Sequence, residues 1–187
     1  ERVGSLGEER GGHMDRLPLS SLIEEIAAPH REFGIDIHIN FDGTPPEPVG
    51  RRDSAILYGL GNLVENAVDF ARSTVEIRAH WTGERLAVDI TDDGEGFSQD
   101  VLAKIGEPYI STRDERRGGS EESGLGLGLF IAKTLLERSG AELTFANRVQ
   151  PEKGAIVSAN WPRSRFELAN NIETADFDLG AAEDMNV

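Results

Sequence analysis

The chain has 187 residues, of which 38% are hydrophobic, and this length and composition suit one domain of ordinary size with tails. Its formal net charge is −15, from 19 basic and 34 acidic residues, which argues against a protein held on nucleic acid by phosphate charge. It contains no cysteine, which excludes disulfides, thiolate zinc sites and cysteine nucleophiles. No apolar run approaches the roughly 18 residues that span a bilayer, so we expect a soluble unit.

The first part of the chain is predicted to hold a linker, a helix and a strand. Residues 1–17 are polar and glycine-rich, which is typical of a linker. Ser20 or Ser21 can cap a helix that starts near Pro18 and ends before Gly34. Isoleucines at 35, 37 and 39 then alternate with polar residues, which predicts a half-buried strand followed by a loop at 42–46.

The rest of the chain continues this alternation. Apolar residues at helical spacing predict a second helix over 52–72. After Arg165 the chain has six acidic residues and no basic one, so 166–187 is expected to be a disordered tail. Between the second helix and this tail we predict a hairpin with strands over 75–81 and 86–90, and then a short helix over 98–105. A long loop over 107–124, a long helix over 125–138 and two more strands over 142–147 and 155–161 follow.

This order of elements predicts an α+β fold. The expected architecture is a two-layer sandwich, with helices packed on one face of a mixed, mainly antiparallel sheet. The loop over 107–124 is long for a compact domain, and loops of that length usually serve a function such as covering a site.

A polar stripe lies along one face of the second predicted helix. Its members, Asn62, Glu65, Asn66 and Asp69, are spaced i, i+3, i+4 and i+7 and therefore share that face. Amide and carboxylate oxygens in such an arrangement can ligate a hard cation such as Mg²⁺. The alternative is the ordinary solvated side of an amphipathic helix.

A second motif follows the hairpin. Asp92 stands at the end of a predicted strand, where its carboxylate could accept a hydrogen bond from the exocyclic amine of a base. Gly94 and Gly96 would let the backbone approach a flat ring. The alternatives are an acidic turn and a calcium loop, although the full calcium-loop pattern is not completed.

A third motif opens the last long helix with alternating glycines. Gly124, Gly126 and Gly128 cost the helix about 1 kcal/mol each, so they need a function. Free N–H groups at a helix start bind anions such as phosphates, whereas the alternative is a flexible hinge. The loop before this helix offers a polyphosphate an aromatic ring, two hydroxyls and a guanidinium, from Tyr109, Ser111, Thr112 and Arg113. The alternative is an ordinary solvated loop.

In this order the motifs resemble the catalytic and ATP-binding domain of two-component sensor histidine kinases. That domain belongs to the Bergerat (GHKL) superfamily, with DNA gyrase, a heat-shock chaperone and a mismatch-repair ATPase. The resemblance covers residues 18–163. The N box, first glycine box, F box, second glycine box and final glycine motif correspond to Asn62–Asp69, Asp92–Gly96, Glu107–Tyr109, Gly124–Gly128 and Gly154–Ala155.

The resemblance implies ATP and Mg²⁺ as cofactors and transfer of the γ-phosphoryl group to a histidine. It implies that Asn66 coordinates Mg²⁺, with Asn62 supporting the phosphates or the metal. Asp92 would bind the adenine amine, and residues 107–124 would form the ATP lid. Nucleotide contacts are further implied for Asp69, Gly94, Gly96, Tyr109, Ser111, Thr112, Arg113, Gly124, Leu125, Gly126, Leu127 and Gly128.

Three positions of the N box bear on the reaction. In the superfamily's ATP hydrolases, a glutamate four residues before the metal-binding asparagine activates water, whereas this chain has Asn62, and an amide cannot act as a general base. Glu65 on the same face remains a possible polariser. Many sensor kinases have lysine where this chain has Asp69, so Arg72 or Arg113 would compensate for the missing cation.

The phosphoacceptor is expected on a separate dimerisation domain. Acceptor histidines of the family are usually followed by an acidic residue, and His13, His30, His38 and His80 are not. We therefore expect an isolated catalytic domain at 18–165, with residues 1–17 as the linker from dimerisation helices. This fragment would be monomeric and cytoplasmic, while the full-length parent would be a homodimer in the bacterial inner membrane.

Residues 107–113 and 124–141 are most similar to the RegB/PrrB type of redox-responsive, membrane-anchored kinases. The similarity implies a response regulator of the RegA/PrrA type as the downstream partner, and no nucleic acid. Two alternatives stay open. One is a nucleotide-binding regulatory module without catalysis, suggested by Asp69 and the missing acceptor. The other is a chaperone- or topoisomerase-type ATPase, against which Asn62 argues.

Overall fold

The computed structural model describes residues 16–32, 34–105 and 122–168. Its elements alternate much as the sequence predicts. In chain order they are β1 (Arg16–Pro18), α1 (Leu19–Ala27), the 3₁₀ turn η1 (Ala28–His30), β2 (Asp36–Gly43), β3 (Val49–Arg51), α2 (Ser54–Phe70), β4 (Thr74–Trp81), β5 (Arg85–Asp92), α3 (Gln99–Lys104), α4 (Glu122–Arg138), β6 (Glu142–Asn147), β7 (Ala155–Pro162) and α5 (Arg163–Leu168).

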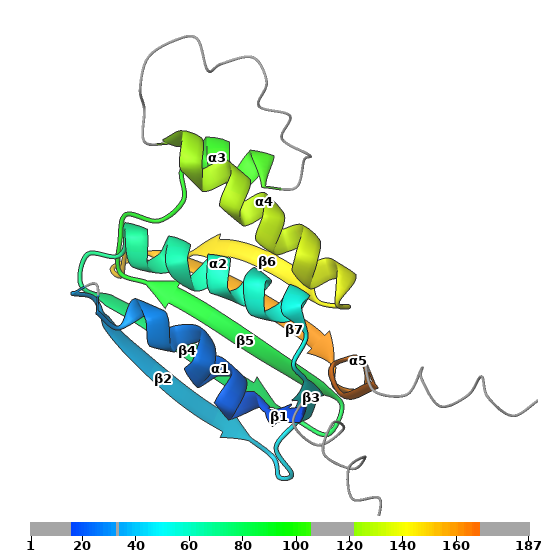
Figure 1. Ribbon diagram of the computed structural model, residues 1–187. Coiled ribbons are helices and arrows are strands. Elements are labelled where there is room, and N and C mark those ends of the chain that lie inside the picture. The colour runs from blue at the N-terminus through cyan, green and yellow to red at the C-terminus, as the bar shows by residue number, and fades with distance from the viewer. Residues whose placement is uncertain (1–15, 33, 106–121, 169–187) are drawn as a thin grey trace, which may run out of the picture.

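The main sheet has five strands in the order β2-β4-β5-β7-β6. β2 pairs with β4 in parallel, and the other neighbours are antiparallel. Helices α1, α2 and α4 lie side by side over one face of this sheet (Figure 1). The predicted α+β architecture, with helices on one face of a mixed and mainly antiparallel sheet, is therefore confirmed.

The core lies between the helices and the sheet, and the period of each element places its residues there. In β4, Val75, Ile77 and Ala79 are buried while the residues between them are exposed, which is the two-residue period of a strand. In α2 the buried residues recur at helical spacing and include Leu60 and Leu63. Burying each such leucine contributes about 1.5–3 kcal/mol to folding.

Close packing of α2 against α4 depends on a glycine. A Cβ atom at Gly59 would lie 2.6 Å from Cγ of Leu136, so a larger residue would push the two helices apart. At the start of α2, Asp53 caps the helix by accepting a hydrogen bond from the N–H of Ala55 at 2.6 Å. These two contacts fix where α2 begins and how near it lies to α4.

The fold continues past Arg165, where the sequence placed the end of the domain. Helix α5 extends to Leu168, and Phe166 is only 3% exposed. The Phe166 ring packs edge-on against Trp161 at a centroid distance of 6.2 Å. The prediction of a tail from residue 166 was wrong at this boundary, because one aromatic side chain in an otherwise polar segment is enough to anchor a helical turn.

Other boundaries also differ from those predicted. Arg16 and Leu17, expected in the linker, belong to β1, which pairs with β3 in a small second sheet. Both strands have only three residues, too few for a period to show in the sequence. β2 reaches Gly43 instead of ending near residue 40, because its parallel pairing with β4 continues to that point. Within the described part of the chain, no helix is long and apolar enough to cross a membrane.

Candidate functional site

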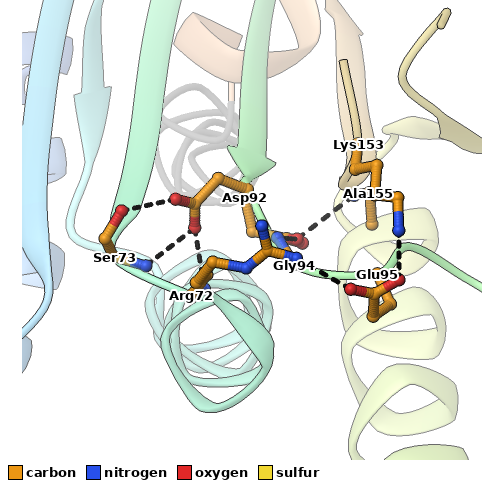
Figure 2. Close-up of polar contacts among 8 residues, drawn as sticks. Arg72, Ser73, Asp92, Gly94, Glu95, Lys153 and Ala155 are labelled. Carbon is orange, nitrogen blue, oxygen red and sulfur yellow. Dashed lines mark hydrogen bonds and ion pairs between the residues drawn. The ribbon is translucent and has the colours of Figure 1, made fainter. Parts of the chain in front are cut away.

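Asp92 is the last residue of β5, and it is 5% exposed. Its Oδ1 atom accepts hydrogen bonds from the backbone N–H groups of Gly94, at 2.8 Å, and Ala155, at 3.2 Å (Figure 2). Among the described residues, none donates a hydrogen bond to the other oxygen, Oδ2. In the same part of the chain, no side-chain polar atom is both fully buried and without a partner, so Oδ2 is not fully buried. Oδ2 is therefore accessible and available to a bound molecule.

Burial raises the pKa of Asp92 above its ordinary value, and the two N–H groups that it accepts from partly oppose this rise. A hydrogen-bond donor that binds Oδ2 would also lower the pKa of Asp92, because it would stabilise the charged carboxylate. The site thus has an acceptor whose desolvation is only partly compensated by the protein itself.

Two glycines let the backbone pass close to Asp92. A Cβ atom at Gly94 would lie 2.1 Å from the carbonyl oxygen of Phe70, and one at Gly154 would lie 1.9 Å from the carbonyl oxygen of Asp92. Gly154 also has a φ of 129°, a conformation that residues with a side chain rarely adopt. Without these glycines, the end of β5 could not approach α2 and β7 so closely.

A cavity of about 230 Å³ opens beside Asp92. Asn66, Asp92 and Gly96, three of the predicted site residues, all line it. Its walls are mostly apolar and come from α2, β5, α3, α4 and β7: Leu63, Ala67, Phe70, Ile90, Val101, Leu129 and Val157. An apolar cavity with a few convergent polar groups is typical of a small-molecule site.

Asn147, at the end of β6, fixes another wall of this cavity. Its Oδ1 atom accepts a hydrogen bond from the N–H of Phe97 at 2.7 Å, and its Nδ2 atom donates to the carbonyl oxygen of Phe97 at 2.9 Å. The side-chain amide thereby makes the pair of hydrogen bonds to the Phe97 backbone that a neighbouring strand would otherwise make. The role of Asn147 is not predictable from the sequence, because its partner Phe97 lies 50 residues away and no local pattern indicates the pairing.

Asp93, next to Asp92, has a structural role that the sequence motifs do not predict. Its carboxylate accepts hydrogen bonds from the backbone N–H groups of Arg72, Ser73 and Thr74, at 2.7, 2.9 and 3.1 Å. It also accepts from the hydroxyls of Ser73 and Thr74. These hydrogen bonds hold the pKa of Asp93 well below its usual range. Asp93 therefore ties the segment between α2 and β4 to the end of β5.

Ion pairs join three loops at the rim of the cavity. Figure 2 shows Glu95 between Arg72 and Lys153, and each of these contacts measures 2.8 Å. Lys153 and Arg72 lower the pKa of Glu95, with the hydrogen bond from Lys153 the largest cause. All three side chains are exposed, so each pair is screened by water and adds little to stability.

The structure separates the members of the polar stripe on α2. Asn66 lines the cavity beside Asp92 and faces α4, where a Cβ atom at Gly128 would lie 3.2 Å from its Nδ2 atom. Asn62 and Glu65 instead line a second hollow, between α1 and α2. Asp69 is exposed and lines neither of these two hollows. Asn62 and Asn66 remain connected, because Nδ2 of Asn66 donates to the Asn62 carbonyl oxygen at 2.7 Å.

The second glycine box lies inside a helix. Helix α4 begins at Glu122, three residues before the predicted start, so only Gly124 lies in the first turn, where N–H groups lack helical partners. Gly126 and Gly128 lie beyond it, where N–H groups bond to carbonyl oxygens four residues earlier. Leu125 and Leu127 share this stretch. The predicted lid residues Tyr109, Ser111, Thr112 and Arg113 lie outside the described residues.

Comparison with known proteins assigns the class. Residues 53–165 match the family described as histidine kinase-, DNA gyrase B- and HSP90-like ATPases. The chain belongs to this family, and membership implies that it binds a nucleotide. Asp92, Asn66 and the cavity between them all lie within the matched region.

Individual relatives give a more specific comparison than the family match does. The chain is 44% identical over 176 residues to the sensor histidine kinase RegB of Cereibacter sphaeroides, an alignment that covers 84% of this chain and 38% of RegB. The chain thus spans well under half of that relative's length. One similar solved structure is the catalytic domain of the histidine kinase ThkA, with a TM-score of 0.58 and 21% identity; the match covers 79% of this chain and 95% of that one. Another is full-length ShkA in complex with AMPPNP, with a TM-score of 0.60 and 23% identity; the match covers 79% of this chain and 31% of that one. At these identities the structures support the fold alone.

Proposed function

We propose that this chain is the catalytic domain of a sensor histidine kinase. It binds Mg·ATP beside Asp92 and transfers the γ-phosphoryl group to a histidine on a separate dimerisation and phosphoacceptor domain. Family membership and the 44% identity to RegB support this proposal. The observation that carries it is the Asp92 carboxylate, held by one oxygen at the edge of an apolar cavity with the other oxygen accessible.

This arrangement favours adenine among the purine bases. The exocyclic amine of adenine is a donor and would reach Oδ2 of Asp92, while the apolar walls cover the faces of the ring. Guanine has a carbonyl oxygen at the corresponding position, which would place two acceptors against each other. We therefore expect the chain to bind ATP in preference to GTP.

Asn66 fits the role proposed for it toward Mg²⁺. Because its Nδ2 atom donates to Asn62, its Oδ1 atom is the one left for a cation. Among the residues that the structure describes, no group of three or more histidines and acids could hold a metal by itself. The other ligands would be phosphate oxygens and water, as is usual for Mg²⁺. The bound metal would neutralise charge on the phosphates.

The proposed phosphate contacts lie near Asn66, on α2 and at the start of α4. Asn62 lies one helical turn from Asn66, and Gly124 offers an N–H group in the first turn of α4. We further propose nucleotide contacts for Leu125, Gly126, Leu127, Gly128, Tyr109, Ser111, Thr112 and Arg113. Asp69, also proposed to contact the nucleotide, lines neither hollow in this structure.

The same residues disfavour hydrolysis. The amide of Asn62 cannot take a proton from water, and Glu65 lines the hollow on the side of α1. A neutral imidazole needs no such base. Its nitrogen lone pair forms the bond to the γ-phosphorus while the bond from phosphorus to the β,γ-bridging oxygen breaks, and ADP leaves with that electron pair.

We propose that the acceptor domain belongs to the same longer chain. Residues 1–15 would lead to dimerisation helices of a homodimer in the bacterial inner membrane, and the phosphohistidine would pass its phosphoryl group to a response regulator of the RegA/PrrA type. The identity to the sensor histidine kinase RegB supports a response regulator as the downstream partner. The fragment itself would be a cytoplasmic monomer.

A transfer assay tests the proposed function. The chain is mixed with its separately expressed acceptor-helix domain and γ-labelled ATP, and we expect labelled phosphohistidine to accumulate on the acceptor. Nucleotide binding without labelled histidine would favour a regulatory module instead. Steady release of phosphate by the chain alone would favour a GHKL-type ATPase.

A further inference from the structure

Five exposed arginines have no acidic partner among the described residues, and their side chains donate no hydrogen bond there: Arg16, Arg51, Arg85, Arg138 and Arg165. Every other arginine or lysine whose side chain the structure describes pairs with an acid: Arg31, Arg52, Arg72, Arg78, Lys133, Arg148, Lys153 and Arg163. In a chain of net charge −15, a group of unpaired cations is the exception. We call these five residues the arginine pole.

Contacts around α5 bring the arginine pole together at one end of the domain (Figure 1). Arg165 lies on α5 itself. A Cβ atom at Gly140 would lie 3.5 Å from Cβ of Arg165, so the end of α4 with Arg138 adjoins α5. β5 begins at Arg85, which pairs with Pro162, the residue before α5.

The small sheet of β1 and β3 completes the pole on another side of α5. A Cβ atom at Gly50 would lie 2.6 Å from the Phe166 ring, and Arg51 is the next residue along β3. Arg51 stands directly opposite Arg16 in the antiparallel pair. Like charges in opposed positions of a sheet destabilise it. The pole lies at the start of β5, whereas Asp92 lies at its end, about 23 Å along the strand.

The segment that follows α5 has the complementary charge. Residues 169–187 contain five acidic residues and no basic one. They begin directly after α5, so the tether keeps their effective concentration at the pole on the order of millimolar, and they can reach up to about 60 Å. The acids at this end do not pair with the pole: Glu167 binds Arg163, and Glu84 and Glu142 make no ion pair among the described residues.

We infer that the arginine pole is the docking surface for the acidic segment 169–187 of the same chain. Its carboxylates would accept hydrogen bonds from the guanidinium groups and offset the repulsion between Arg16 and Arg51. Each exposed pair is weak, so docking depends on several pairs acting together and on low salt. The inference does not rest on the proposed function, because the pole and Asp92 lie at opposite ends of β5.

A spin label on the segment tests the contact directly. The chain has no cysteine, so Ala181→Cys takes a label at one position. Paramagnetic broadening of the amide signals of Gly50 and Ser139 is measured by NMR in three versions of the full chain. One version has the unchanged pole, and the pole variant carries Arg51→Gln, Arg138→Gln and Arg165→Gln. The matched control removes the same charge at paired positions elsewhere, with Arg31→Gln, Arg78→Gln and Lys133→Gln.

At about 50 mM salt we expect the broadening rate to be at least about twofold higher with the unchanged pole and in the control than in the pole variant. About 0.5 M salt should lower the rate with the unchanged pole to that of the pole variant, because exposed charges are then screened. Equal rates in all three versions, or an equal fall in the control, overturn the inference. It is also overturned if the rates are equal while phosphatidylglycerol vesicles bind only chains with the unchanged pole, since the pole then serves an anionic lipid surface.

Discussion

Asp92 and Asp93 are adjacent and chemically identical, yet the fold gives them opposite properties. Burial raises the pKa of Asp92, whereas hydrogen bonds from residues 72–74 lower that of Asp93. Asp92 leaves one oxygen for a ligand, while Asp93 uses both within the protein. The sequence could suggest that one of the pair binds a base, but only the structure shows what the other one does.

Asp92→Asn should separate binding from folding. The asparagine oxygen can still accept from Gly94 and Ala155, but its NH₂ group would face the adenine amine, so donor meets donor. We expect Mg·ATP affinity to fall about 10- to 100-fold, or about 1.4–2.8 kcal/mol. Because a desolvated charge is removed, the free energy of unfolding should be unchanged or higher. Calorimetry and denaturant unfolding measure the two quantities; wild-type affinity in the variant would contradict the role given to Asp92.

Asp93→Asn should instead affect stability, in a pH-dependent way. The folded-state pKa of Asp93 lies below its unfolded value of about 3.9, so its stabilisation is complete above that value and is lost as the pH falls toward the folded pKa. We expect the variant to lose about 1–2 kcal/mol at pH 7. The difference from wild type should shrink when urea unfolding is repeated at pH 3. Asp36→Asn, at an exposed position of β2, is the control, and a difference independent of pH would refute this role.

At the scale of elements, the site depends on how the end of β5 meets β7. The loop between β6 and β7 returns to the sheet through Gly154, and the next N–H group, of Ala155, is the one that holds Asp92. Asn147 at the other end of that loop holds Phe97. One hairpin therefore positions two sides of the cavity.

Gly154→Ala should disrupt this hairpin. The new Cβ atom would fall 1.9 Å from the carbonyl oxygen of Asp92, and alanine would be strained at a φ of 129°. We expect a loss of about 2–4 kcal/mol in the free energy of unfolding, together with weaker nucleotide binding. Gly83→Ala is the matched control, since its Cβ would meet nothing within 4 Å, and should change stability by less than about 0.5 kcal/mol. Equal stability of the two variants would show that the contact is not restrictive.

At the scale of the whole molecule, the sequence predicted what depends on local period. The helices and strands with clear apolar spacing, and the layer arrangement that follows from their order, were confirmed. It missed β1, β3 and α5, whose segments are too short to show a period. It also missed Asn147 and Asp93, because their partners are distant in sequence and become neighbours only when the sheet forms. The polar stripe of α2 was predicted as one cluster, but a helix face is wide enough to border two hollows.

We propose that the chain transfers a phosphoryl group from ATP to histidine, with Asn66 holding the metal and phosphates. The most direct measurement is autophosphorylation of the full-length kinase with γ-labelled ATP and Mg²⁺, comparing wild type with Asn66→Ala. We predict label on a histidine of the wild type, and a rate at least about 100-fold lower, or about 2.7 kcal/mol, in a variant that remains folded. Equal labelling of Asn66→Ala, or phosphate release without labelled histidine in the wild type, would contradict it.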